Sequence, residues 1–93
     1  MDMADLKQEI TERVCKVLVK KIDVNYRLLT EEGLELPLTG RKIGLRARDL
    51  VYLFFEVEKE FDIKINTDNL ENYKFNTILG IVELVMEQKA NVL

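Results

Sequence analysis

The sequence predicts an all-α fold built as one domain. Apolar residues recur at spacings of three and four in three separate segments, which is the period of an amphipathic helix. No strand-period segment and no internal repeat competes with this pattern. The chain has 93 residues, 47% of them hydrophobic, and we expect residues 1–93 to share a single core.

The first helix is predicted over residues 5–22. Asp2 or Asp5 is expected to cap its start, and Lys20 and Lys21 suit the negative end of its dipole. Charged side chains cover much of its remaining surface. Its apolar stripe comprises Leu6, Ile10, Val14, Val17 and Leu18.

Residues 23–45 are predicted to form a long first loop, because glycines and Pro37 interrupt the apolar period. A connection of this length is unusual in a compact domain. Residues 26–32 are expected to hold a short helical turn. Four apolar side chains are expected to pin the loop to the helices: Leu34, Leu36, Leu38 and Ile43.

The second helix is predicted over residues 47–61, and its apolar arc is wider than one core contact requires. One stripe of this arc is expected to face the core. It comprises Leu50, Leu53, Phe54, Val57 and Phe61.

A second stripe on the same helix combines cations with apolar and aromatic side chains. Tyr, Phe and Arg are enriched at protein interfaces, so we predict that this stripe binds a partner. The alternative is that residues 50–55 are wholly internal, with Phe55 filling space beneath the loop. The predicted partner-binding residues are Arg46, Arg48, Val51, Tyr52, Phe55 and Lys59.

The C-terminal third is predicted to contain a short turn and a long helix. The turn covers residues 67–72, and the helix covers residues 77–88 with Asn76 as its cap. Residues 90–93 are expected to fray. The buried stripe of the last helix comprises Ile78, Ile81, Val82 and Val85.

The second helix and its exit resemble the corresponding region of acyl carrier proteins. In that family the helix ends in an acidic run, Phe-Asp and a short apolar exit. The resemblance implies a four-helix bundle of three long helices and one short helix, with a long first loop, over about residues 6–86. The residues that carry it are Glu56, Glu58, Glu60, Phe61, Asp62, Ile63 and Ile65, and the segment Phe75-Asn76-Thr77-Ile78 resembles the entry into the family's last helix.

The chain departs from the family at the attachment site of the prosthetic group. The family's Asp-Ser-Leu motif follows a glycine, and Gly44 is present here, but the motif positions hold Arg46, Ala47 and Arg48. Ala47 therefore occupies the position of the serine, and the whole chain contains no serine. We expect no 4′-phosphopantetheine and no priming by the ordinary transfer reaction.

Positive charge surrounds the start of the second helix, where acyl carrier proteins present acidic residues. Each cation at a helix N-terminus costs roughly a few tenths of a kcal/mol, because the helix dipole is positive at that end. One interpretation is that these side chains are merely solvated, and the other is that they receive an acidic or phosphate group. They are Arg41, Lys42, Arg46 and Arg48.

Conventional catalysis and metal binding are not expected. Histidine and serine are absent and Cys15 is the single cysteine, so the nucleophile–histidine pairs and zinc ligand sets are missing. We expect Cys15 to be a small half-buried side chain. The acidic residues from Glu56 to Asp62 are interpreted as a solvated face, and the glycines around Arg41 lack the spacing of a phosphate-binding loop.

The net charge, the length of the apolar runs and the cysteine content indicate which partners and which compartment to expect. The net charge of −3 argues against nucleic-acid binding, and no apolar run approaches the length of a membrane span. The single cysteine fits a reducing compartment, and we expect a cytoplasmic monomer.

These observations predict a non-enzymatic, acyl-carrier-like protein without a phosphopantetheine site, which serves as a docking or scaffold partner for a biosynthetic or peptide-modifying enzyme. A narrower resemblance is to the acyl-carrier-related proteins of bacterial peptide-maturation systems, some of which depart from the serine motif. Two alternatives remain at this point: a genuine acyl or peptidyl carrier with an unusual attachment, and a helical module that binds an anionic ligand at the start of the second helix.

Overall fold

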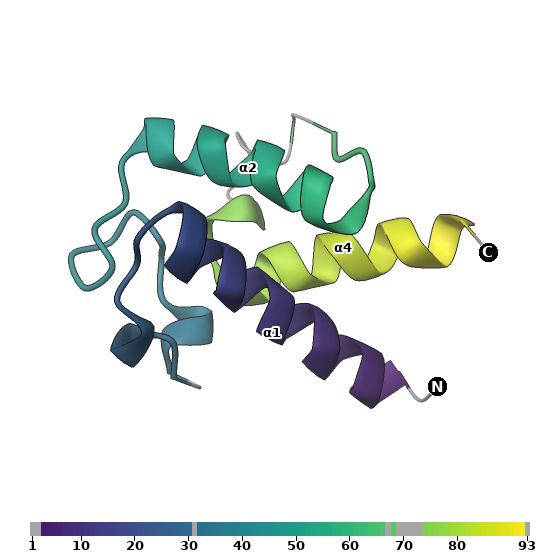
Figure 1. Ribbon diagram of the computed structural model, residues 1–93, viewed down its shortest axis with the longest axis horizontal. Coiled ribbons are helices and arrows are strands. Elements are labelled where there is room, and N and C mark those ends of the chain that lie inside the picture. The colour runs from purple at the N-terminus through teal and green to yellow at the C-terminus, as the bar shows by residue number, and fades with distance from the viewer. Residues whose placement is uncertain (1–2, 31, 67, 69–73, 93) are drawn as a thin grey trace.

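The computed structural model describes residues 3–30, 32–66, 68 and 74–92, and in these residues it is all-helical, without strands. The long helices are α1 (Met3–Lys21), α2 (Ala47–Phe61) and α4 (Ile78–Val92) (Figure 1). Short 3-10 helices occur at η1 (Tyr26–Leu28), η2 (Gly33–Glu35) and η3 (Lys74–Asn76). The predicted all-α class is confirmed for the described residues. The bounds of α2 agree with the prediction.

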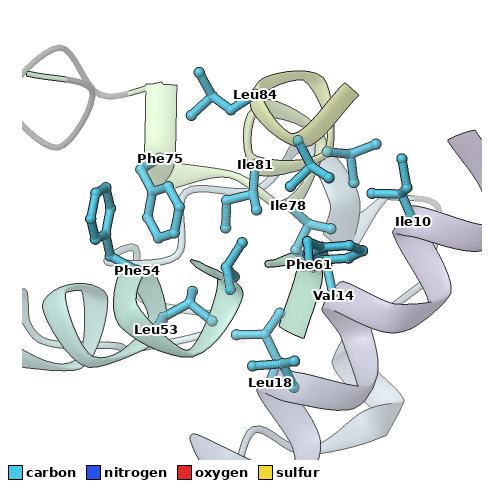
Figure 2. Packing of buried hydrophobic residues seen from close by; sticks show 14 of the residues in the cluster. Ile10, Val14, Leu18, Leu53, Phe54, Phe61, Phe75, Ile78, Ile81 and Leu84 are labelled. Atoms are coloured by element: carbon cyan, nitrogen blue, oxygen red, sulfur yellow. The ribbon is translucent and has the colours of Figure 1, made fainter. Parts of the chain in front are cut away.

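The three long helices share one apolar core, to which each contributes the stripe expected from its sequence (Figure 2). The Phe54 ring of α2 lies 5.4 Å from the Phe75 ring, measured between centroids. Leu6 and Leu50, at the ends of their stripes, are partly buried against the core. The buried residues of the long helices are Ile10, Val14, Val17, Leu18, Leu53, Phe54, Val57, Phe61, Ile78, Ile81, Val82, Leu84 and Val85.

The long first loop is held by hydrogen bonds to the end of η3, just before α4. Leu38 is fully buried, and its backbone N–H donates to the Asn76 carbonyl oxygen at 2.6 Å. The backbone N–H and the hydroxyl of Thr39 both donate to Asn76 Oδ1, at 3.2 and 3.1 Å. Of the other apolar loop residues, Leu34 and Ile43 pack on the core as predicted, whereas Leu36 is half-buried outside it.

Asn76 is not the cap of the last helix, which corrects the prediction. The Thr77 hydroxyl accepts the backbone N–H of Gly80 at 2.9 Å and therefore caps α4, since Ile78 is the first helical residue. Asn76 and Thr77 are both good capping residues. The Asn76 side chain accepts the backbone N–H of Thr39 in the loop, and it does not cap α4.

The helix ends also differ from the prediction. The backbone of α4 is helical to Val92, beyond the predicted end at residue 88, and the fraying expected over residues 90–93 stays a prediction. Helix α1 begins at Met3, which places Asp5 inside the first turn and not at the cap. Asp2, Leu93 and most of the predicted turn at 67–72 lie outside the described residues.

Helices α1 and α2 are each followed by an aspartate in the left-handed region. Asp23 and Asp62, which follow them, have positive φ angles of 66° and 52°, in the left-handed region. The backbone N–H of Ile63 donates to the Glu58 carbonyl oxygen, five positions earlier, at 3.1 Å, whereas that of Val24 donates to the Leu18 carbonyl oxygen, six positions earlier, at 3.0 Å. The bond from Ile63 is the six-to-one bond of a Schellman ending, and both bonds satisfy carbonyls that the helices leave free.

Candidate protein-interaction surface

The start of α2 is formed by a turn and one carboxylate. Gly44 has a φ of +74°, which favours glycine, and Arg46 follows as the N-cap with an extended backbone. The backbone N–H of Arg46 donates to Asp49 Oδ2 at 2.9 Å. Because a guanidinium has no acceptor, only this half of a capping box can form. Ala47 is the first residue of α2 and is exposed.

The four cations predicted near this end are all exposed. None of them forms an ion pair with another part of the described chain. Asp49 is the acidic residue of the first turn and offsets part of their charge at the helix N-terminus. The region is therefore positively charged and available to an external group. Its cations are Arg41, Lys42, Arg46 and Arg48.

Three large apolar side chains are exposed side by side on α2. Val51, Tyr52 and Phe55 are 44, 49 and 54% exposed, and the other large apolar side chain that is this exposed in the described residues is Tyr26. The alternative in which residues 50–55 are wholly internal is therefore wrong for these three. Their positions at spacings of three and four place them on one side of the helix.

Cations flank these apolar residues at both ends. Arg48 precedes Tyr52 by one helical turn, and Lys59 follows Phe55 by one turn. The Lys59 ammonium lies 3.6 Å from a Glu56 carboxylate oxygen, with its side chain 75% exposed. We name this surface the α2 face, and it comprises Arg46, Arg48, Val51, Tyr52, Phe55 and Lys59.

The Phe55 side chain contacts the apolar core on its inner side. Its ring meets the buried Phe54 ring edge-on, with centroids 5.7 Å apart, and Phe54 in turn packs on Phe75. Beside Phe55 lies a hollow of about 340 Å³, whose wall includes Ile63 and Lys64. The sequence prediction missed these two residues because they follow the end of α2, outside the helical period.

The interpretation of a solvated acidic face is wrong for Glu56 and Glu58, which are half-buried, whereas Glu60 and Asp62 are exposed. Glu58 Oε2 accepts the backbone N–H of Ile65 at 2.9 Å, and Glu60 lies 3.6 Å from the Arg13 guanidinium. The side chain of Glu56 is only 12% exposed. Glu58 and Glu60 therefore connect the end of α2 to the following segment and to α1. The described residues contain no group of three or more side chains that could hold a metal ion.

Cys15 is half-buried, as predicted. Burial, with a smaller contribution from the neighbouring Glu12 carboxylate, raises the pKa of its thiol. A raised pKa leaves the thiol protonated and weakly nucleophilic at neutral pH.

Comparison of the chain with protein-family models, with curated proteins and with solved structures gave no match. The resemblance to acyl carrier proteins therefore depends on the residues of this chain alone. Among the described residues, no helix has both the length and the apolar character needed to cross a membrane.

Proposed function

We propose that this chain is a non-catalytic, acyl-carrier-like protein that docks on a biosynthetic or peptide-modifying enzyme through the α2 face. The observation that carries the proposal is the exposure of Val51, Tyr52 and Phe55 next to one another on a helix whose other side is buried. Adjacent exposed apolar side chains are costly to leave in water and commonly mark protein contacts. Tyr, Phe and Arg are also the residue types that contribute most at interfaces.

The carrier-like part of the proposal is supported by the helix order and by one position. A long loop separates α1 from α2, and Ala47 is exposed at the first position of α2, where a carrier would hold its prosthetic arm. Alanine offers no hydroxyl for that arm. The four-helix form stays part of the proposal, because residues 67–72 lie mostly outside the described part of the chain.

The charges on the α2 face indicate the character of the partner. Arg46 and Arg48 lie at one end of the apolar residues and Lys59 lies at the other. A partner with acidic groups opposite Arg46 and Arg48 and an apolar centre would match this arrangement, because Lys59 is already paired with Glu56. Complementary charge speeds association and selects the partner. The chain would thereby reverse the usual polarity of carrier docking, in which the carrier supplies the acids.

One specific observation favours a second candidate, a module that binds an anionic ligand. Arg41, Lys42, Arg46 and Arg48 are exposed and lack ion-pair partners in the described residues. The Asp49 carboxylate already accepts a backbone N–H at this helix end, so an external anion would gain less by binding there. Titration of the labelled chain with CoA or inorganic phosphate, followed by amide shifts at residues 44–49, separates the two candidates.

Capture of the partner tests the docking proposal. The tagged chain is used as bait in lysate of the organism that encodes it, and captured proteins are quantified by mass spectrometry. Phe55→Ala should remove the main captured protein, whereas Tyr26→Ala should not, since Tyr26 is 67% exposed but lies outside the α2 face. Equal loss with both variants would contradict a specific α2 contact.

Intact mass tests the absence of the arm. The chain is incubated with CoA and a phosphopantetheinyl transferase beside a conventional carrier protein as positive control. We expect no mass gain on this chain. A pantetheine-sized gain would instead establish a genuine carrier with an unusual attachment.

A further inference from the structure

A groove lies between α1 and the first loop, away from the α2 face. Two hollows, of about 420 and 250 Å³, adjoin there and share Cys15, Lys16 and Leu29 as lining residues. Their combined space is in the range of small-molecule sites. We name this surface the α1 groove.

Apolar groups form much of its lining. Cys15 and Val19 contribute from α1, and Leu29 and Leu34 contribute from the loop. Burial keeps the Cys15 thiol protonated at neutral pH, so it adds no charge to the lining. An occupant therefore gains most by placing an apolar body along these residues.

Hydrogen bonds hold the loop side of the groove in shape. The backbone N–H of Leu29 donates to the Tyr26 carbonyl oxygen at 3.0 Å, and that of Leu34 donates to the Thr30 carbonyl oxygen at 3.1 Å. A Cβ at Gly33 would collide with the carbonyl oxygen of Leu28, so the turn admits only glycine there. A wall formed before binding reduces the ordering cost of an occupant.

Positive charge lies along one edge of the groove. Lys16 and Lys20 are exposed and one helical turn apart, and neither forms an ion pair within the described residues. Glu12 lies one further turn toward the start of α1, at the other end of the groove. This asymmetry favours an occupant whose negative group lies near the lysines and away from Glu12.

We propose that the α1 groove binds a medium-chain carboxylate, with its alkyl chain along Cys15 and Leu29 and its carboxylate beside Lys16 and Lys20. The groove follows α1 from Thr11 to Lys20, about 13 Å at the helical rise, which suits a medium alkyl chain. This length and volume lie in the range of small-molecule sites, so a small ligand matches the groove. The proposal is independent of docking at the α2 face.

Amide shifts of the labelled full chain test the proposal, with sodium decanoate added below its critical micelle concentration. We expect saturable shifts at Cys15 and Leu29 and none at Val51 or Phe55, which serve as internal controls. Butanoate, with a shorter chain, and decylammonium, with the opposite charge, should each bind about tenfold more weakly or worse, because each lacks one of the two contacts. Decanoate should also slow the alkylation of Cys15 by N-ethylmaleimide.

Two double variants with the same change in net charge test where the carboxylate of the ligand binds. Lys16→Glu/Lys20→Glu should weaken decanoate binding about tenfold, because two attractive charges become repulsive. Lys7→Glu/Lys21→Glu changes the net charge equally on the same helix but outside the α1 groove, and should leave binding unchanged. Absence of saturable shifts, equal binding of decylammonium, or equal effects of the two double variants would overturn the proposal.

Discussion

The Arg13 guanidinium lies over the Phe61 ring, with 4.4 Å between its central carbon and the ring centroid. The same group donates from Nη2 to the Glu60 carbonyl oxygen at 2.6 Å, and Lys89 Nζ donates to the Phe61 carbonyl oxygen at 3.1 Å. Cations from α1 and α4 therefore satisfy the last carbonyls of α2, where the helix dipole is negative. This arrangement fixes one end of the helix that displays the α2 face.

Loss of the Arg13 contacts should destabilise the fold. We expect Arg13→Ala to lower the free energy of unfolding by about 1–3 kcal/mol, since a charge-assisted hydrogen bond and a cation–π contact disappear together. Urea unfolding measures the change. Arg27→Ala is the control, because Arg27 lies 5.9 Å from the exposed Tyr26 ring and should cost less than about 0.5 kcal/mol. Equal costs would show that the contacts at Phe61 contribute nothing specific.

Glycine at the left-handed helix endings should stabilise the chain. Asp23 and Asp62 adopt positive φ angles that glycine reaches without strain, and their charges lie at negative helix ends. Asp62→Gly and Asp23→Gly should each raise the free energy of unfolding by about 0.5–1 kcal/mol. Asp62→Ala removes the charge but keeps the strain, so it should gain less than Asp62→Gly. A loss of stability in both glycine variants would contradict this account of the endings.

The anchor of the first loop depends on an acceptor at residue 76. Asn76→Ala removes Oδ1 and should cost about 1–2 kcal/mol, together with faster hydrogen exchange at the Thr39 amide. Asn76→Asp keeps an oxygen acceptor at the same position and should retain most of the protection. If both variants exchange at the wild-type rate, the side chain does not hold the loop.

The reactivity of Cys15 should follow its raised pKa. At pH 7 we expect iodoacetamide to alkylate the folded chain more slowly than it alkylates the chain unfolded in guanidinium chloride, and the folded rate should rise with pH. The folded state favours the protonated thiol, so this group contributes stability below the unfolded pKa and loses it as pH rises through the folded value. A folded rate equal to the unfolded rate at pH 7 would contradict the burial of the thiol.

The sequence predicted the helices best where the apolar period was long and uninterrupted. The bounds of α2 agree with the prediction, because its two stripes together specify both the buried and the exposed side. The choice between Asn76 and Thr77 as a cap could not be made locally. It was decided by the contact between Asn76 and Thr39, which lie far apart in the sequence.

The candidate surfaces were predictable to different degrees. Exposure of Val51, Tyr52 and Phe55 followed from an arc wider than the core needs. The hollow beside Phe55 and the α1 groove did not follow, because each brings a helix together with residues beyond its period, such as Ile63 and Leu29. Such non-local contacts leave no regular pattern in the sequence.

The most direct test of the central claim compares stability and partner affinity for Phe55→Ala, with the captured partner purified and binding measured by calorimetry. Phe55 is 54% exposed, so we predict a loss of less than about 1 kcal/mol in unfolding free energy. We predict at least about a tenfold loss of partner affinity, as for an aromatic anchor residue. Unchanged affinity, or a stability loss of about 3 kcal/mol or more as for a buried phenylalanine, would contradict the claim that the α2 face is a docking surface.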